Sequence, residues 1–354
     1  MHKFLECYVP ISACNMRCKY CYVTQNGWWD NKKEDFSFVN RIKEAFSKER
    51  LGGQCMINMC ATGETLLYPE VLDIVKIFLE NDHYVMLVTN GTMTERFKTV
   101  CEWPESIKKH LFFKLSFHYL ELKRISKLDE YFENIRMLHD AGVSFTVELT
   151  PDDSYVPYID EIKKICFEEL GTLCHVTVCR DETKKGYPLM SSMSKEEFVD
   201  MWSGFNSELF SYKYSIFEEK RKEFCYAGLW SAVIDLKSGD YRQCYKGKAL
   251  GNIYDMTKPL NFVAIGHNCR EGHCFNGHAF LGFGLIPGLD TVDFADMRDR
   301  TDGVFASWLS PEMDSFMRTK LYEYNKELAD SEKIISDIKS ISLMMIAKKV
   351  LGKM

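Results

Sequence analysis

The chain has 354 residues with 45 Lys and Arg against 51 Asp and Glu, so its formal net charge is -6, and 46% of its residues are hydrophobic. This length and composition can bury a core, which excludes a disordered or collagen-like polymer. The charges form no strongly basic region, so we expect no nucleic-acid partner. The sequence contains no run of 18 apolar residues, and no membrane-spanning helix is expected.

The chain contains 14 cysteines, about twice the number that we would expect for its length. It begins at Met1 with charged residues close by and shows no apolar signal segment. We therefore expect a reducing, cytoplasmic compartment. There, surplus thiols indicate metal ligands or reactive groups before they indicate disulfides.

The first half of the chain alternates short β-branched or aromatic runs with amphipathic helix patterns. The predicted strands are 4–11, 55–60, 84–88, 112–118, 144–149 and 175–179. The predicted helices between them include 39–47, 71–80, 128–140 and 158–169. This alternation favours a curved parallel sheet, either a partial barrel or a doubly wound sheet, and we prefer a partial (β/α)6 barrel over residues 1–194. In such barrels the functional residues follow the carboxyl ends of the strands.

The pattern changes after residue 194, which predicts a second, smaller α/β unit over residues 195–300. A helical stretch over 195–223 precedes two strands, 231–236 and 241–245, which form a hairpin around a Lys-Ser-Gly-Asp turn. The irregular stretch 266–288 needs a ligand or metal to hold it. Residues 301–354 form a helical extension, broken near Asp330. Its last part is apolar on one side with lysines between, so it docks on a partner, on a membrane surface or back on the barrel.

Three cysteines stand within eight residues directly after the first predicted strand, in the order Cys14-Asn-Met-Arg-Cys18-Lys-Tyr-Cys21. This tight spacing suits an iron-sulfur cube, in which three thiolates leave one iron open to an amino and carboxylate chelate. The alternative is a structural zinc site. Such sites normally close all four positions with two Cys pairs or added His.

The spacing CxxxCxxC, with Tyr20 just before the third cysteine, resembles the radical SAM superfamily over about residues 4–180. The resemblance implies a [4Fe-4S] cluster held by Cys14, Cys18 and Cys21, with S-adenosylmethionine (SAM) bound at its open iron. It also implies a 5'-deoxyadenosyl radical that abstracts a substrate hydrogen atom. An electron donor such as flavodoxin or ferredoxin would be a partner.

Further motifs match cofactor-binding positions of this superfamily. Thr62-Gly63-Glu64 follows the second predicted strand, where the family usually has Gly-Gly-Glu, and Thr62 departs from that pattern. In the family's arrangement the glycine lets the backbone approach the ligand, and the Glu64 carboxylate accepts from the methionine ammonium. Thr89-Asn90-Gly91 resembles a loop near the cofactor, although alone it reads as a turn. Ser116 matches a position that contacts the ribose. The implied cofactor-binding residues are Tyr20, Thr62, Gly63, Glu64, Thr89, Asn90 and Ser116.

A second group of cysteines lies in the smaller unit. Cys225-x13-Gly-x4-Cys244 resembles the opening of the SPASM/Twitch auxiliary-cluster domain, and Cys269-x4-Cys274 fits the shorter Twitch form. The resemblance implies a second, auxiliary [4Fe-4S] cluster closed by four thiolates. The alternative is a four-cysteine zinc site.

Three candidate catalytic residues stand at the ends of predicted strands. Cys179 ends the sixth strand and is a candidate hydrogen-atom donor, as in some radical SAM epimerases. His118 and Glu148 end the fourth and fifth strands, where each could orient a hydroxyl or amide. For all three, the alternative is a wall residue without a chemical role.

The sequence predicts the substrate less directly than the cofactor. Twitch-type relatives include enzymes that epimerise or oxidise carbinol carbons, so we expect a small or carrier-linked sugar or cyclitol. Peptide modification is the second interpretation. We disfavour it because the cysteine loop begins at residue 14 and leaves no room for a preceding recognition domain. A third interpretation is a non-catalytic iron-sulfur electron-transfer protein.

Overall fold

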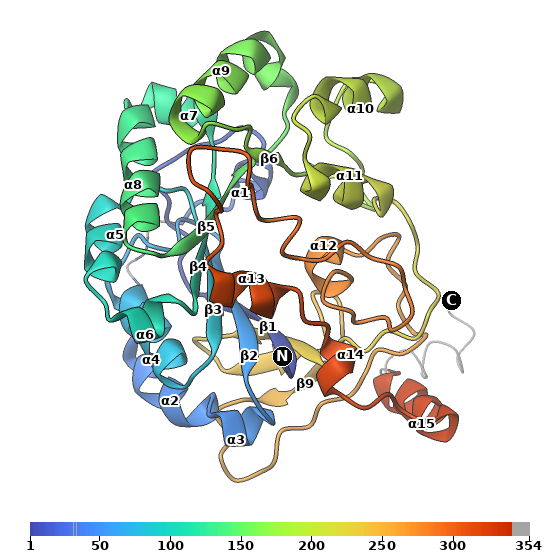
Figure 1. Ribbon diagram of the computed structural model, residues 1–354. Helices are drawn as coiled ribbons and strands as arrows, with labels where there is room; N and C mark the ends of the chain where they lie inside the picture. The colour runs from blue at the N-terminus through green and yellow to red at the C-terminus, as the bar shows by residue number, and fades with distance from the viewer. Residues whose placement is uncertain (31, 33, 342–354) are drawn as a thin grey trace.

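The computed structural model describes residues 1–30, 32 and 34–341 and shows nine strands in a single sheet. The strands are β1 (Lys3–Val9), β2 (Cys55–Ala61), β3 (Tyr84–Thr89), β4 (Leu111–Ser116), β5 (Ser144–Leu149), β6 (His175–Val176), β7 (Ser231–Asp235), β8 (Asp240–Arg242) and β9 (Ala249–Asn252). Their order is β6-β5-β4-β3-β2-β1-β7-β8-β9, and neighbouring strands among the first six are parallel. The predicted α/β class and parallel partial-barrel core are confirmed (Figure 1).

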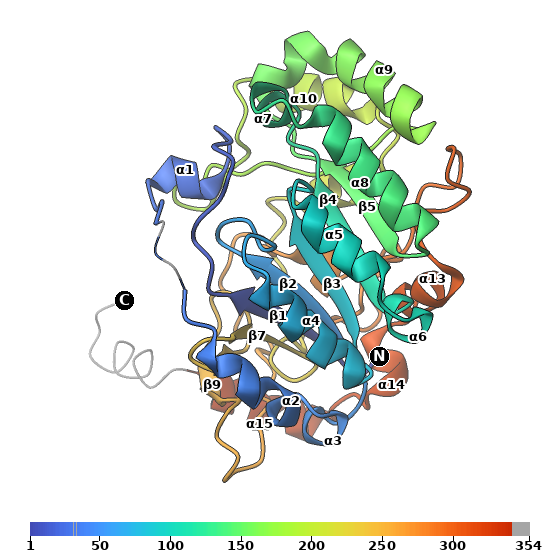
Figure 2. The same cartoon turned by 90° about the vertical axis from the view of Figure 1, so that its left-hand side faces the viewer.

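Helices cover one face of this sheet (Figures 1 and 2). The helices of the first half are α1 (Tyr22–Asn26), α2 (Ile42–Ala45), α3 (Lys48–Leu51), α4 (Glu70–Glu80), α5 (Thr94–Cys101), α6 (Glu105–Lys108), α7 (Tyr119–Arg124), α8 (Leu128–Asp140) and α9 (Ile159–Leu170), with 3-10 turns at Ser37–Arg41 and Asp153–Tyr158. The apolar faces of α4, α8 and α9 pack on the strands in one hydrophobic core. Three of the four predicted helices, 71–80, 128–140 and 158–169, match α4, α8 and α9 to within one residue at each end.

Strand β1 shows how the two faces of the sheet differ. Side chains alternate along a strand, so Leu5, Cys7 and Val9 enter the core under the helices. On the opposite face Phe4 belongs to a second hydrophobic core, where its ring lies 5.3 Å from the ring of Phe283. The C-terminal half of the chain therefore covers the face of the sheet opposite the helices, near the start of β1.

The predicted hairpin is present, but it is not a separate unit. β7 and β8 pair antiparallel, and β7 also pairs parallel with β1, with Phe4 opposite Ser231 and Tyr8 opposite Asp235. Gly239 allows the tight turn of the hairpin because it adopts a φ of 82°. One continuous sheet thus joins the barrel to the second cysteine-bearing segment.

Three predicted elements differ from the structure. The helical stretch predicted for 195–223 is two helices, α10 (Lys195–Ser203) and α11 (Glu208–Ser215), because the Ser207 side chain accepts from the Phe210 N–H and starts a new helix. Within residues 301–341 the extension contains three helices, α13 (Pro311–Met317), α14 (Leu321–Tyr324) and α15 (Asp330–Ser340), which follow the short α12 (Gly277–Phe280). The sixth strand pairs only through His175 and Val176.

Helix α15 packs back on the second unit with its polar side. Asp337 accepts hydrogen bonds from the backbone N–H and the ring Nδ1 of His267, both at 2.9 Å. Its opposite side exposes Ile334, Ile335 and Ile338. The rest of the predicted apolar and lysine-rich stretch, residues 342–354, lies outside the described residues. Nowhere in the described ranges does a helix have the length and apolar character needed to cross a bilayer.

Candidate active site

The first three cysteines lie on the loop between β1 and α1. Cys14, Cys18 and Cys21 all line one pocket of about 100 Å³. The Cys14 sulfur accepts a hydrogen bond from the N–H of Met16 at 3.4 Å, and Cys21 is the extended residue that precedes α1. The loop therefore directs three thiols from eight residues of sequence into one space.

Polar side chains from β2 and β3 face these thiols across the pocket. Glu64 Oε1 accepts from the Thr89 hydroxyl at 2.6 Å, and Glu64 Oε2 accepts from the Asn90 N–H at 2.7 Å. The Asn90 side chain donates to Asn15 Oδ1 at 2.7 Å. Burial raises the pKa of Glu64, whereas these hydrogen bonds favour its charged form. The predicted Thr62, Gly63, Glu64, Thr89 and Asn90 thus line the same pocket as the cysteines.

Gly63 is needed for a contact within the chain itself. A Cβ at this position would lie 2.0 Å from the backbone oxygen of Ala13. The Gly63 N–H donates to the Ile11 oxygen at 2.8 Å, and the Glu64 N–H donates to the Ala13 oxygen at 3.0 Å. The glycine therefore lets the Glu64 segment pack directly against the start of the cysteine loop.

His118 and Ser116 complete this pocket at the end of β4, whereas Tyr20 does not line it. The Tyr20 hydroxyl lies 2.6 Å from His118 Nδ1 and 2.9 Å from the Tyr155 hydroxyl. Burial lowers the pKa of His118 to about 4, so its imidazole is neutral near pH 7. Tyr20 is thus a positioning residue behind His118.

The donor set of this pocket fits the cluster that the sequence implies. Three thiols share the pocket with a carboxylate and an amide, and burial raises the pKa of Cys14 to about 11 and that of Cys21 above its usual value. Iron binding must displace those thiol protons. Cys14, Cys18 and Cys21 would each hold one iron of a cube, and the fourth iron would keep an open position for an exogenous ligand.

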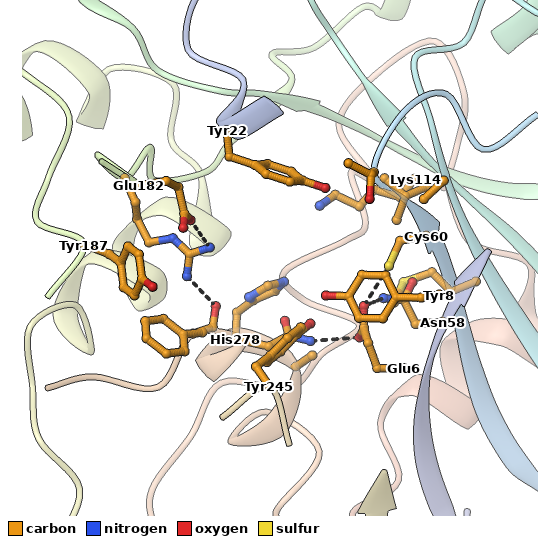
Figure 3. A pocket seen from close by; sticks show the side chains of 18 of the residues that line it. Glu6, Tyr8, Tyr22, Asn58, Cys60, Lys114, Glu182, Tyr187, Tyr245 and His278 are labelled. Carbon is orange, nitrogen blue, oxygen red and sulfur yellow. Dashed lines mark hydrogen bonds and ion pairs between the residues drawn. The ribbon is translucent and has the colours of Figure 1, made fainter. Parts of the chain in front are cut away.

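A larger cavity of about 580 Å³ adjoins the cysteine pocket. Both spaces are lined by Ala61, Thr62 and Val88, from the ends of β2 and β3. Figure 3 shows Glu6, Asn58 and Cys60 on one side of the cavity and Glu182 and Tyr187 on the opposite side. A volume of this size accommodates a small organic molecule.

A buried carboxylate organises one wall of the large cavity. Glu6 Oε1 accepts from the Asn58 amide at 2.8 Å and from the Cys60 thiol at 3.2 Å, and Glu6 Oε2 accepts from the Asn276 amide at 3.1 Å (Figure 3). Burial raises the pKa of Glu6. The sequence contains a pattern that indicates this wall. In β1, Glu6 and Tyr8 stand two positions apart among apolar residues, and in β2 the same holds for Asn58 and Cys60. Residues two apart in a strand lie on the same face of the sheet. None of these four residues was among the predicted site residues.

Glu148 lies behind the cavity and not on its surface. It is 3% exposed and forms ion pairs with Lys114, at 3.0 Å, and with Arg298. Lys114 and Arg298 line the cavity, whereas Glu148 does not. Glu148, which was predicted to orient a substrate group, therefore pairs with two cationic side chains that line the cavity.

Cys179 also lies away from both spaces. The predicted sixth strand would have placed it at the cavity, but β6 ends at Val176. Its sulfur lies 3.8 Å from the Met190 sulfur within the hydrophobic core, and burial raises its pKa to about 12. Among the residues that line the large cavity, the thiol is that of Cys60.

The second group of cysteines gathers beside the large cavity. Cys274, Cys244 and Cys269 each add to the effect of burial in raising the pKa of Cys225, so the four cysteines lie in one region of the molecule. Among the described residues, no three or more His, Cys, Asp or Glu side chains are already arranged to hold a metal ion. Residues that directly follow two of them line the cavity. These residues are Tyr245, Lys246, Phe275 and Asn276. The cavity thus lies between the two groups of thiols.

Comparisons with known proteins give one family match and several similar structures. Residues 8–151 match the family model of the radical SAM superfamily. No curated protein matches the sequence significantly. Among solved structures, SuiB from Streptococcus suis is similar with 14% identity over 72% of this chain and 64% of that chain, at a TM-score of 0.47. The chain therefore aligns with less than two thirds of SuiB.

Two further solved structures are similar over the same share of the chain. The structure of anSMEcpe with bound AdoMet has 17% identity over 72% of this chain and 79% of that chain, at a TM-score of 0.49. BtrN in complex with AdoMet and 2-DOIA has 14% identity over 72% of this chain and 80% of that chain, at a TM-score of 0.33.

Proposed function

Since the chain belongs to the radical SAM superfamily through residues 8–151, we propose that it abstracts a hydrogen atom from a small polar substrate bound in the large cavity. The target is a carbinol carbon of a sugar or cyclitol, free or carrier-linked, and the outcome is epimerisation or oxidation. A reduced protein of the flavodoxin or ferredoxin class supplies electrons.

One observation carries this proposal. The cysteine pocket and the large cavity share the walls formed by Ala61, Thr62 and Val88. A cofactor held at Cys14, Cys18 and Cys21 therefore borders the space in which a substrate fits. This adjacency is what a radical abstraction needs, because the reacting atoms must approach to within about 3–3.5 Å.

Different residues of the cysteine pocket would bind the cluster and SAM. Cys14, Cys18 and Cys21 hold the cluster, and Glu64 presents a carboxylate for the SAM ammonium. When bound, the cluster and SAM supply a 5'-deoxyadenosyl radical that can remove a hydrogen atom from an unactivated C–H bond. His118, which lines the same pocket and is held by Tyr20, would add no positive charge to it because its imidazole is neutral near pH 7.

Of the two outcomes, the position of Cys60 favours epimerisation. Its thiol lines the cavity and donates to Glu6 at 3.2 Å. A hydrogen atom from this thiol to the opposite face of the substrate radical inverts the carbon and leaves a Cys60 thiyl radical. One electron from the external donor and one proton through Glu6 restore the thiol.

The proposal is tested by anaerobic reconstitution and reduction in the presence of SAM. We expect formation of 5'-deoxyadenosine by the wild type and none by Cys18→Ala, because the open iron requires three thiolate ligands. Cys101→Ala is the matched control, since Cys101 lies on α5 outside both spaces and should leave the reaction unchanged. Equal cleavage by Cys18→Ala contradicts the proposal, and no cleavage by the wild type would leave the electron-transfer interpretation.

A substrate screen separates the two substrate classes. Product formed from polyols supports the proposal. Product formed only from peptides would replace it with peptide modification.

A further inference from the structure

The large cavity holds more positive than negative charge. Five cationic side chains line it, and only Glu6 and Glu182 are carboxylates among its lining. The cations are Lys114, Arg180, Lys213, Lys246 and Arg298. Glu182 forms an ion pair with Arg180, with 2.9 Å between the carboxylate oxygen and the guanidinium nitrogen. Glu6 accepts hydrogen bonds from the neutral groups of Asn58, Cys60 and Asn276.

Lys114 and Arg298 share one carboxylate between them. Both pair with Glu148, so one negative charge faces two positive charges. Arg298 is fully buried, and its Nε and Nη2 have no hydrogen-bond partner within the described ranges. A buried cation without full compensation is unfavourable unless a ligand supplies the missing charge.

Lys213 is less compensated still. Its ammonium donates to the Thr177 hydroxyl at 2.6 Å, and in the described part of the chain no carboxylate lies within ion-pair distance of it. Burial, and then the charges of Lys114 and Arg180, lower its pKa well below the usual value. When protonated, Lys114, Arg298 and Lys213 carry three positive charges against the single carboxylate of Glu148, which leaves two in surplus among these groups.

His278 lies among the same groups. It is 8% exposed, lines the cavity, and its Nδ1 has no hydrogen-bond partner in the residues that the structure describes. Figure 3 shows its ring below the open space, with Tyr22 above it. An unpaired, buried ring nitrogen beside surplus ammonium groups is the environment of an anion site.

We propose that the substrate carries a phosphate monoester, and that this dianion lies among Lys114, Lys213 and His278. The inference rests on the proposed function for placing the substrate in this cavity. The methionine carboxylate of SAM is not the anion in question, because neither lysine nor His278 lines the cysteine pocket. A dianion matches the two surplus charges, whereas a carboxylate would leave one uncompensated.

The experiment measures binding of three hexose probes to the reconstituted protein with saturating SAM, by anaerobic calorimetry without reductant. The probes are glucose, glucuronate and glucose 6-phosphate. We expect glucose 6-phosphate to bind at least about tenfold more tightly than the other two. Lys213→Gln should lose this preference, and Lys213→Arg should retain most of it. Lys98→Gln, which changes an exposed lysine on α5, is the matched control.

Melting curves of each variant show whether it is folded. Failure of wild-type protein to prefer glucose 6-phosphate overturns the inference, as does tightest binding of glucuronate or an unchanged preference in folded Lys213→Gln. SAM cleavage is assayed separately on the wild type. A preference for glucose 6-phosphate without SAM cleavage would contradict the proposed function and support the anion site. SAM cleavage without that preference would support the proposed function and contradict the anion site.

Discussion

Lys114 links the affinity for an anion to pH. Burial, and then the charge of Arg298, lower its pKa to about 7. The charged or titratable groups around it are Arg298, Glu148, Glu6, Cys60, Lys213 and His278. An anion beside the ammonium favours its charged form and raises this pKa, so binding takes up a proton wherever the free lysine is neutral.

Binding of glucose 6-phosphate should therefore weaken as pH rises from 7.5 to 9, by up to about tenfold per unit for each proton taken up. Above pH 7 the phosphate is already largely a dianion, so its own titration contributes little. Lys114→Arg keeps the charge without titrating in this range and should reduce the slope by up to one proton. Calorimetry in two buffers of different ionisation enthalpy checks the proton uptake. An identical slope in the variant contradicts this role of Lys114.

Cys60 and Cys179 are alternative candidates for the thiol that returns a hydrogen atom to the substrate radical. Cys60 lines the cavity and donates to Glu6, whereas Cys179 is packed against Met190 in the core. With a substrate identified by the screen, turnover in D2O should place deuterium at the target carbon in wild type and in Cys179→Ser. Cys60→Ser should lose it. Mass spectrometry of the product decides, and label that disappears only in Cys179→Ser would restore the sequence-based prediction.

Helix α15 fixes the loop that leads to Cys269. Asp337 binds the His267 N–H and ring, and Asn268 donates to the Asp337 backbone oxygen at 2.9 Å. Asp337→Ala removes both carboxylate hydrogen bonds and should lower the free energy of unfolding by about 1–3 kcal/mol. Ile334→Ala, at a side chain that is 62% exposed, should change it by less than about 0.5 kcal/mol. Denaturant unfolding compares them, and equal effects would show that α15 does not hold the loop.

The strands and helices of the first half were predictable where the hydrophobic period of the segment matches the packing and pairing that it finds in the fold. The strand at Ser144–Leu149 and the helix at Leu128–Asp140 have their predicted bounds, because each shows a single hydrophobic period along its length. The sixth strand was predicted too long, since its residues alternate as in a strand but only His175 and Val176 pair with β5. Pairing of β7 with β1 joins residues more than 220 positions apart, which no local pattern encodes.

The candidate site divides in the same way. The cysteine pocket follows from one short motif and from the rule that strand ends meet at one edge, so nearly all its predicted residues lie together. The large cavity is assembled from β1, β2 and β4 with Lys213, His278 and Arg298 from the second half. Their charges have meaning only through burial and proximity, which a sequence without a fold does not reveal.

At the scale of the whole molecule, the second group of thiols is connected along the chain to residues that line the large cavity. Cys274 directly precedes Phe275 and Asn276, which line the cavity, and Asn276 donates to Glu6 Oε2 at 3.1 Å. A metal centre at Cys225, Cys244, Cys269 and Cys274 would hold this segment in place, because site and local fold are coupled at such centres. The first pocket shares no residue with that segment.

If the second group holds an auxiliary [4Fe-4S] cluster, the reconstituted chain should contain about eight irons, four at each group of cysteines. Cys274→Ala should lower this number to about four and weaken binding of glucose 6-phosphate, because the Phe275–Asn276 wall and its bond to Glu6 lose their support. SAM binding should persist, since Cys14, Cys18 and Cys21 remain. Metal analysis and calorimetry on the same preparations check all three results. One zinc with about four irons in the wild type would show a zinc site, and unchanged phosphate binding in Cys274→Ala would show that the second centre does not support the cavity.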